Sequence, residues 1–471
     1  MKRVRLILLW MGIICSACSQ GLAALNPLPS ESVLPSQSTS LLQMDPTGNF
    51  SSPSPVGTNR PLITITPSPF PKTMTPTIQP GWLFPDSEVV YSPTALDFDI
   101  QAYLDQTHGW LKNYREYLKS TAWTSAVQII QRVALENSIN PRLLLALLEY
   151  HCDCVLGDLP SNVDQDYLLG NGDYHRKGLF RQLSWASSRL SAGYYGWRGG
   201  SLLEIDLGHR VNIPIDPKIN AGSVALEYYF AFYQDASIWK NALDPSYGIA
   251  AVYQKMFGDV WKRTAKYEPL ILANLRQPPL ILPFEPGRRW AFTSGPHVAW
   301  ETEGALAALD FAPATYESGC VHSDAWITAV ANGVITRSEF GEVLLDLDGE
   351  DGSIADGFEQ TGWSILYMHV ATEDRIPVGS RVQAGDRIGH PSCEGGRATG
   401  THVHIARKYN GEWVLADGTI PFNLEGWIAH AGKKLYEGTL TRDGDTVIAH
   451  PYGSYETIIT RPTATARPTP Y

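Results

Sequence analysis

The stretch Gly400-Thr401-His402-Val403-His404-Ile405-Ala406 decides the fold that we predict for the second half of the chain. Polar and apolar side chains alternate along it and several are β-branched, which is typical of a strand. Residues two apart on a strand project from the same face, so His402 and His404 point the same way. Two imidazoles on one face suit a metal site, where one binds zinc and its neighbour handles a proton. A His-x-His pair also arises by chance, so its partners elsewhere in the chain decide this prediction.

The sequence around this stretch has the character of a β-rich domain, which we place at residues 285–440. From about Glu285 the composition shifts to Gly, Val, Ile and Asp. Short apolar runs are separated by turn-forming pairs, which favours an antiparallel sheet. Examples of these runs are WITAVANGVITRS, EVLLDLD and WSILYMHV.

The preceding region, residues 96–275, is predicted to be an α-helical domain. Apolar residues from Ala126 to Ala134 keep the spacing of one buried helix face. Asn140-Pro141 provides the cap and first-turn proline of another helix, and a third helical run begins at Ala221. The predicted fold class is therefore multidomain α + β, with a helical domain followed by a mostly antiparallel β domain.

The N-terminus has the features of an export signal over residues 1–18. Basic residues precede an apolar run that is too short to span a bilayer, and Ser16-Ala17 leads to Cys18. A cysteine at this point resembles the bacterial lipobox, which implies a lipid anchor on Cys18; the alternative is a plain secretory signal. A Pro/Ser/Thr-rich stretch follows, so we predict a disordered linker over 19–95. A second disordered tail is predicted over 460–471.

The net charge argues against a nucleic-acid-binding protein, and the cysteine content of an exported chain allows disulfides. The 471 residues carry a net charge of -11, which gives no electrostatic footprint for nucleic acid. In an exported protein the cysteines beyond the signal can be oxidised, and four of them allow three pairings. We predict that Cys320 pairs with Cys393. For the other two cysteines, the alternative is zinc binding by Cys152-Asp-Cys154. One residue between the two cysteines is a tighter spacing than zinc motifs usually have.

The helical region loosely resembles the lysozyme-like lytic transglycosylases over roughly 150 residues. The segments that carry the resemblance are NPRLLLALLEYHC, KGLFRQL and INAGSVALEYY. The family's catalytic glutamate corresponds to His151 here, and Glu149 lies on another side of the helix. We therefore expect this domain to bind glycan or to support its neighbour. Retained glycosidase activity and a helical bundle unrelated to glycan are the alternatives.

The β-rich region resembles the lysostaphin-type, LytM-like zinc endopeptidases, which cut peptidoglycan peptides. The resemblance covers about residues 292–413 and rests on five elements in the family's order: GPHVAW, ALDFAP, LYMHV, VGSRVQAGDRIGH and GTHVHIA. It implies that His297, Asp310 and His404 bind Zn²⁺, leaving a fourth position for water. Twelve residues separate His297 from Asp310, more than in most members. A longer insertion at this point is similar to the β-lytic branch. The alternative is that the interval is not an insertion in the motif and that Asp310 is an ordinary polar residue after an apolar run.

The same resemblance implies that His369 and His402 are the catalytic histidines. One would accept a proton from the zinc-bound water, whose pKa the metal lowers, and both would steady the oxyanion; which one is the base stays open. His322 and His390 lie near this region, are given no role by the resemblance, and are expected to be ordinary surface or core hydrogen-bonding residues.

The function predicted from the sequence is zinc-dependent hydrolysis of peptidoglycan stem or cross-bridge peptides. The protein is expected to be exported and lipid-anchored to the membrane or envelope, with peptidoglycan and the membrane as its partners. Two alternatives are a non-catalytic wall-binding protein that keeps the peptidase fold, and a glycan-cleaving enzyme that works through the helical domain.

Overall fold

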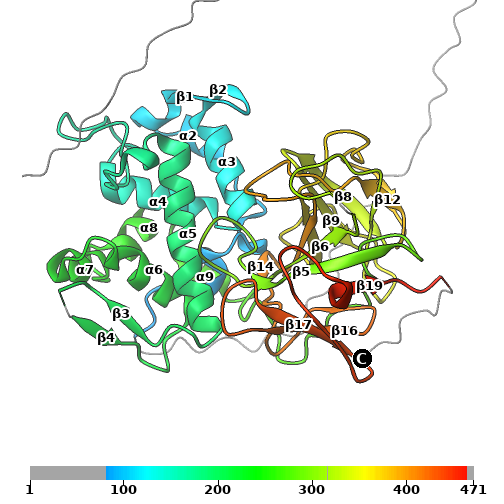
Figure 1. The fold of residues 1–471 in the computed structure, drawn as a ribbon. Helices are drawn as coiled ribbons and strands as arrows, with labels where there is room; N and C mark the ends of the chain where they lie inside the picture. The colour runs from blue at the N-terminus through cyan, green and yellow to red at the C-terminus, as the bar shows by residue number, and fades with distance from the viewer. Residues whose placement is uncertain (1–80, 210, 316, 464–471) are drawn as a thin grey trace, which may run out of the picture. The chain divides into compact units, whose positions relative to one another are not determined.

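The computed structural model describes residues 81–209, 211–315 and 317–463 (Figure 1). The chain divides into the units Met1–Ser68 and Pro69–Tyr471, and all described residues belong to the second. The predicted signal, Cys18, most of the linker and residues 464–471 lie outside the described part. Among the described residues, no helix has the length and apolar character needed to cross a membrane.

Helices dominate the first half of the described chain. They are α1 (Asp86–Val89), α2 (Ile100–Asp105), α3 (Ala126–Asn137), α4 (Pro141–Cys152), α5 (Leu179–Arg198), α6 (Ala221–Ala231), α7 (Ala236–Ala242), α8 (Ile249–Phe257) and α9 (Val260–Thr264). Two small hairpins accompany them: β1 (Arg115–Leu118) with β2 (Ala122–Ser125), and β3 (Glu204–Asp206) with β4 (Asn212–Pro214).

Side-chain caps mark the starts of α3 and α4, and the cap of α4 is the one predicted at Asn140. Ser125 and Gln128 form a capping box at the start of α3, whose apolar face is buried. The Asn140 side chain accepts a hydrogen bond from the Arg142 N–H, and Pro141 occupies the first position of α4. The predictions of helices in these two segments and from Ala221 are confirmed.

A large sheet follows, and all its pairings are antiparallel, as predicted. Its order is β11 (Arg381–Val382), β8 (Gly333–Glu339), β9 (Glu342–Leu347), β10 (Trp363–Met368), β13 (Val403–Tyr409), β6 (Ala308–Pro313), β5 (Arg289–His297) and β19 (Ile458–Thr460), with β14 (Glu412–Trp413) beside β13. A four-stranded sheet contains β15 (Asn423–Leu424), β16 (Trp427–Ala431), β17 (Gly438–Arg442) and β18 (Asp445–Ile448). The short strands β7 (Ile327–Thr328) and β12 (Arg387–Gly389) pair with each other.

The central strands of the large sheet are buried on both faces. On β10, Leu366 and Met368 belong to the core shared with the helices, while Ile365 and Tyr367 belong to the core on the other face. This alternation follows from the two-residue period of a strand. Burial on both faces gives the near-continuous apolar run that the sequence shows there.

Two predicted boundaries differ from the structure. Residues 81–95, assigned to the linker, are folded: Phe84 and Val89 are buried, and Ser92 caps a short 3₁₀ helix over Pro93–Ala95. Their apolar side chains fill part of the helical core. The prediction failed here because the Pro/Ser/Thr-rich composition of the whole segment masked the apolar residues at its end. At the other end, the β structure continues past residue 440. The first residues assigned to the disordered tail are ordered, because Thr460 pairs with Arg289 of β5 and Arg461 is buried against Glu425.

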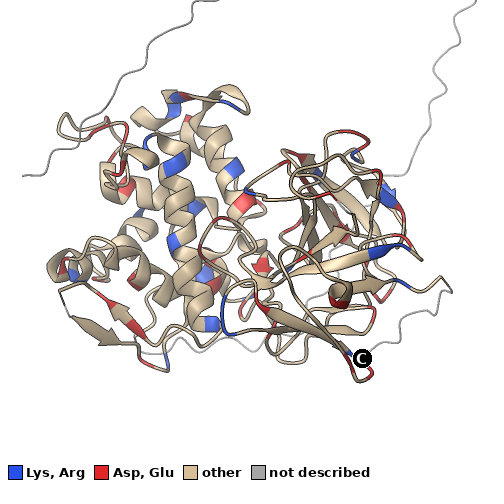
Figure 2. Cartoon of the chain, in the orientation of Figure 1, with Lys and Arg blue, Asp and Glu red and all other residues tan. Residues whose placement is uncertain are grey.

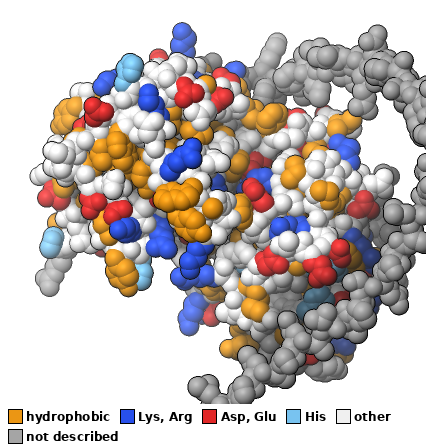
Figure 3. Space-filling model, turned by 90° about the horizontal axis from the view of Figure 1, so that it is seen from above, with side chains coloured by type: hydrophobic (Ala, Val, Ile, Leu, Met, Phe, Trp, Pro, Cys, Tyr) orange, Lys and Arg blue, Asp and Glu red, His pale blue; other side chains and the backbone are white. Residues whose placement is uncertain are grey.

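Charged and apolar groups are mixed over the surface. Basic and acidic residues are interspersed among the helices and strands in Figure 2. The face in Figure 3 shows hydrophobic side chains in small groups among polar ones. Scattered apolar groups of this kind are normal for a protein surface.

Candidate metal centre

Four adjacent strands bring the predicted metal ligands and catalytic histidines together. His297 ends β5, Asp310 lies on β6, and His404 lies on β13 directly opposite Asp310. His369 follows β10, which pairs with the other edge of β13, and His402 comes immediately before β13. The antiparallel register therefore gathers five side chains from three separate parts of the sequence.

The three predicted ligands form a compact cluster. His297 Nε2 lies 3.0 Å from His404 Nδ1, and each nitrogen lies 3.2 Å from Asp310 Oδ1. Ligand atoms about 2.0–2.2 Å from a tetrahedral zinc ion would be roughly 3.3 Å apart. The observed separations are close to this value. All three residues are buried, and they are the His/Cys/Asp/Glu group among the described residues that could hold a metal ion.

The outer nitrogens fix the tautomers of both histidines. His297 Nδ1 lies 2.9 Å from the Gly295 carbonyl, and His404 Nε2 lies 3.1 Å from the Ala299 carbonyl. A carbonyl can only accept, so each of these nitrogens carries the proton. The facing nitrogens are therefore unprotonated lone pairs. Protein metal sites commonly orient their histidines by this kind of backbone bond.

This arrangement fits a cation. The two imidazole lone pairs and Asp310 Oδ1 are three acceptors that face one another, and Asp310 Oδ1 is buried without a hydrogen-bond donor. Buried acceptors without donors are costly. A zinc ion would satisfy all three, and its preference for imidazole nitrogen and carboxylate oxygen matches the set.

The charge balance of the cluster shifts its pKa values. Burial alone would raise the pKa of Asp310, but the neighbouring His297 and His402 hold it well below its usual range. Burial opposes protonation of His297, yet the Asp310 carboxylate outweighs it and raises the pKa of that imidazole. Burial is the main cause that lowers the pKa of His404. The carboxylate is therefore ionised whenever the protein is folded near neutral pH.

The two predicted catalytic histidines lie side by side next to this cluster. The ring centroids of His369 and His402 are 4.4 Å apart, and His402 Nε2 lies 3.7 Å from Asp310 Oδ2. His369 Nδ1 donates to the Glu394 carbonyl at 2.9 Å and His402 Nδ1 to the Gly400 carbonyl at 2.7 Å. Each Nε2 is therefore an acceptor. Burial, followed by the neighbouring imidazoles, lowers the pKa of His369 to about 3, so its ring is neutral.

The long interval between His297 and Asp310 forms the β5–β6 connection. Residues 298–307 lie outside both strands, and the Ala299 carbonyl in this connection accepts the proton of His404. Gly304 approaches Ser191 of α5, and the Ser188 hydroxyl donates to the Glu303 carbonyl at 3.3 Å. The insertion thus connects the strands that carry His297 and Asp310, and its Ala299 carbonyl also accepts a hydrogen bond from His404.

Two further histidines near the site, His322 and His390, have the ordinary roles expected of them. His322 is exposed and lies 3.1 Å from Asp324. His390 is buried against Trp326, and its Nδ1 donates to the Ala325 carbonyl. Neither approaches the cluster closely enough to join it.

The chain is similar to known proteins, both in its helical part and over most of its length. Residues 82–270 match the family model described as LasA, N-terminal domain. The chain is 24% identical over 351 residues to Protease LasA of Pseudomonas aeruginosa strain UCBPP-PA14, covering 71% of this chain and 75% of that protein. This chain is similar to a protease over most of its length. Protease LasA from the PAO1 strain matches with the same identity and coverage.

Solved metallopeptidase structures also match the chain over shorter stretches. The M23 metalloprotease Pseudoalterin from the deep sea matches 38% of this chain and 96% of its own, with 22% identity and a TM-score of 0.30. The catalytic domain of lysostaphin from Staphylococcus simulans covers 27% of this chain and 89% of its own, with 20% identity and a TM-score of 0.19.

The LasA N-terminal model covers the helical part, where Glu149 and His151 both form hydrogen bonds within the domain. Glu149 accepts the Val155 and Leu156 N–H groups, each at 3.0 Å. His151 contacts the Tyr229 and Tyr233 hydroxyls, and burial lowers its pKa to about 4. His151 is therefore a neutral imidazole and not the carboxylic acid that glycosidic cleavage uses.

The structure also forms two disulfides. Cys320 is bonded to Cys393, and Cys152 to Cys154. A disulfide has no thiolate with which to bind zinc, so the alternative of a metal site at Cys152 and Cys154 is not supported.

Tyr436 also lies beside the site, although no sequence motif includes it. Its ring lies 5.0 Å from that of His297, centroid to centroid, and its carbonyl accepts the Gly295 N–H at 2.8 Å. Tyr436 sits in the connection between β16 and β17, far from every motif, so the sequence offered no signal for it. Gly295 tolerates this approach because it lacks a Cβ, which would lie 2.5 Å from the Glu437 carbonyl oxygen.

Proposed function

We propose that this chain is a zinc-dependent endopeptidase that hydrolyses peptide bonds in peptidoglycan. The observation that carries the proposal is the cluster of three facing acceptors beside two further imidazoles with free Nε2 lone pairs. The similarity to Protease LasA supports a peptidase. The choice of peptidoglycan rests on the resemblance of the five sequence motifs to the LytM-like enzymes.

His297, Asp310 and His404 would hold the metal. When bound, zinc supplies Lewis acidity, which polarises an amide carbonyl and lowers the pKa of a water molecule. The chain itself orients the three ligands through the register of the strands and through the Gly295 and Ala299 carbonyls.

His369 and His402 would move the proton. Their Nε2 atoms are acceptors, so one of them takes the proton from the attacking water. Only after this step does that histidine have an Nε2–H with which to stabilise the oxyanion and protonate the departing amine. Burial lowers the pKa of His369, so its ring is unprotonated at neutral pH.

The remaining parts of the proposal come from the sequence. We infer that residues 1–18 direct export and that Cys18 carries a lipid anchor, which would hold the enzyme at the outer face of the cytoplasmic membrane or elsewhere in the cell envelope, near its peptidoglycan substrate. We further infer that the helical part, with its loose lysozyme-like motifs, binds glycan or supports the peptidase rather than cleaving sugar.

The test is an end-group analysis. The protein from Asn26 onward is incubated with zinc and purified peptidoglycan, and new α-amino groups and new sugar ends are quantified. New amino groups that disappear with a zinc chelator and in His404→Ala support the proposal. New sugar ends would instead assign the activity to the helical part, and no new ends would favour a wall-binding protein.

A further inference from the structure

The catalytic histidines, unlike the predicted metal ligands, depend on loops. His297, Asp310 and His404 belong to paired strands of the sheet. His369 and His402 lie just outside the ends of β10 and β13. Something other than the main sheet ladder must therefore fix their positions.

One loop holds His369. The Ser392 N–H and hydroxyl both donate to the His369 carbonyl, at 2.7 and 2.9 Å. Two residues later, the Glu394 carbonyl accepts the proton of the His369 ring at 2.9 Å. Residues 392–394 thus bind both the backbone and the side chain of this histidine.

A second loop holds the segment before His402. The Gly319 carbonyl accepts the Thr401 N–H at 3.0 Å, and the Val321 N–H donates to the Thr401 hydroxyl at 2.9 Å. The same hydroxyl donates to the Val321 carbonyl. These bonds fix the backbone immediately before His402, whose own N–H reaches the Ser392 carbonyl at 3.3 Å.

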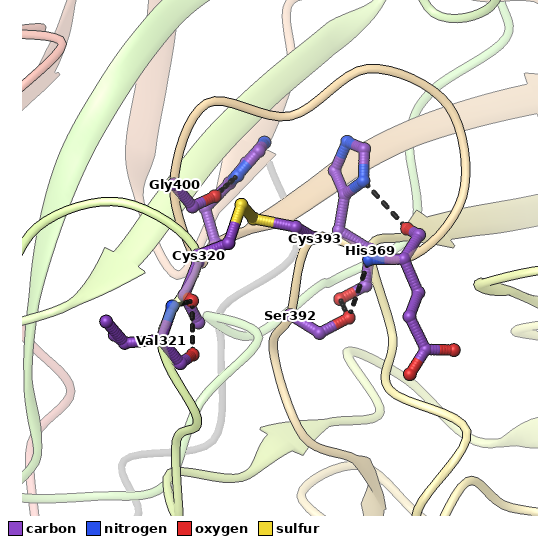
Figure 4. Close-up of a disulfide and its surroundings, with 9 residues drawn as sticks. Cys320, Val321, His369, Ser392, Cys393 and Gly400 are labelled. Carbon is purple, nitrogen blue, oxygen red and sulfur yellow. Dashed lines mark hydrogen bonds between the residues drawn. A yellow bond between two sulfur atoms is a disulfide. The ribbon is translucent and has the colours of Figure 1, made fainter. Parts of the chain in front are cut away.

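A disulfide joins the loop that binds His369 to the loop that binds Thr401 (Figure 4). Cys320 lies between Gly319 and Val321, and Cys393 lies between Ser392 and Glu394. The loops also flank a hollow of about 250 Å³. Both cysteines line this hollow, and the disulfide links the loops in addition to the hydrogen bond between the His402 N–H and the Ser392 carbonyl.

We propose that the Cys320–Cys393 disulfide is a positioning element, which aligns His369 with His402 and is not required for metal binding. This inference rests on the proposed function. Losing the bond would let the two loops move separately, while the strands would still hold the three metal ligands. A small misplacement of catalytic groups costs roughly 100-fold in rate.

The test compares Cys320→Ser/Cys393→Ser with the matched control Cys152→Ser/Cys154→Ser, which removes the other disulfide. In the first variant we expect kcat to fall about 10- to 100-fold, KM to change little and zinc affinity to remain within about threefold. In the control we expect no change in any of the three. Unchanged kcat in the first variant, or zinc affinity lost in parallel with kcat, would overturn the inference.

A second readout is independent of turnover. In the native protein, ¹⁵N NMR of labelled histidine should show His369 and His402 protonated at Nδ1, as their carbonyl partners require. The disulfide variant should show mixed tautomers at these two rings and unchanged signals from the zinc ligands. If the native protein has no peptidase activity, the proposed function fails, yet the NMR comparison still tests the disulfide's role. Native-like tautomers in the variant would refute it.

Thr401 provides a milder substitution if the disulfide variant does not fold. Thr401→Val keeps the shape but removes both side-chain bonds to Val321. Thr401→Ser retains the hydroxyl. We expect Val to reproduce the loss of kcat and the mixed His402 tautomer, and Ser to restore both. Equal behaviour of the two variants would contradict the proposed alignment.

Discussion

His404 Nδ1 lies 3.2 Å from Asp310 Oδ1 across two directly paired strands, and both atoms are acceptors. Two buried acceptors at this distance need a cation or a proton between them. The backbone, through the Ala299 carbonyl, has already placed the imidazole proton on the opposite nitrogen. The strand register therefore builds a site that is satisfied best by a metal ion.

Asp310→Asn is expected to abolish zinc binding while leaving a folded protein. The amide N–H₂ can donate to the lone pairs of His297 and His404, so the cluster no longer needs a cation. Zinc at 100 times its Kd stabilises a native site by about 2.7 kcal/mol. Added zinc should therefore raise the Tm of the native protein but not that of the variant, as thermal unfolding would show.

The control for this substitution is His322→Ala, because His322 is exposed and outside the cluster. It should retain the zinc-dependent rise in Tm. A normal rise in Asp310→Asn would exclude Asp310 as a ligand.

His369→Gln and His402→Gln should each lower kcat without loss of zinc. General acid–base catalysis typically contributes 10²- to 10⁴-fold, so we expect a decrease of about that size for whichever histidine is the base. The measurement is kcat together with zinc content. The larger effect would identify the base. The structure does not distinguish the two histidines in this respect, because both Nε2 atoms are acceptors. Loss of zinc equal to that in His404→Ala would instead make the residue a ligand.

Local sequence rules predicted much of the fold. The periodicity of residues 126–134 predicted α3, and Asn140-Pro141 predicted the start of α4, because caps and buried helix faces depend on neighbours in sequence. The alternation around His402 and His404 predicted a strand, and β13 begins at Val403. The structure also brings together the five site residues that the motifs named.

The parts that could not be predicted depend on the backbone or on distant contacts. The carbonyls of Gly295, Ala299, Gly400 and Glu394 set the four imidazole tautomers, and a carbonyl has no side-chain signature. Tyr436 reaches His297 only because the β16–β17 connection passes Gly295. The folding of residues 81–95 depends on a core that other segments complete.

Asp346 should make the protein less stable as the pH rises. It is buried on β9, and burial, with smaller contributions from nearby carboxylates, raises its pKa to about 7. Between about pH 4 and 7 the folded state keeps a proton that the unfolded chain releases, so the free energy of unfolding falls with increasing pH. Asp346→Asn cannot ionise, yet its carbonyl oxygen can still accept the Gly357 N–H.

Urea unfolding at pH 4.5 and 8 tests this expectation. Native protein and variant should be similarly stable at pH 4.5, and the variant should be more stable by a few kcal/mol at pH 8. A constant difference between the two proteins at both pH values would show that Asp346 does not titrate in this range.

The buried Lys408–Glu359 pair is expected to act as a unit. Lys408 Nζ lies 2.8 Å from Glu359 Oε2, and its side chain is 1% exposed. Lys408→Met removes the cation and leaves Glu359 with Arg337 alone, whose Nε lies 2.9 Å away. Breaking a buried pair costs about 3–5 kcal/mol, and we expect the lower end because Arg337 remains.

Lys408→Met/Glu359→Gln removes both charges and should recover most of this loss. A double-mutant cycle measured by urea unfolding gives the coupling directly. Because Lys408 shares β13 with His404, the single variant should also weaken zinc binding if the strand shifts, whereas the double variant should not. Strictly additive losses would mean that the two charges are stabilised independently, with Arg337 rather than Lys408 as the main partner of Glu359.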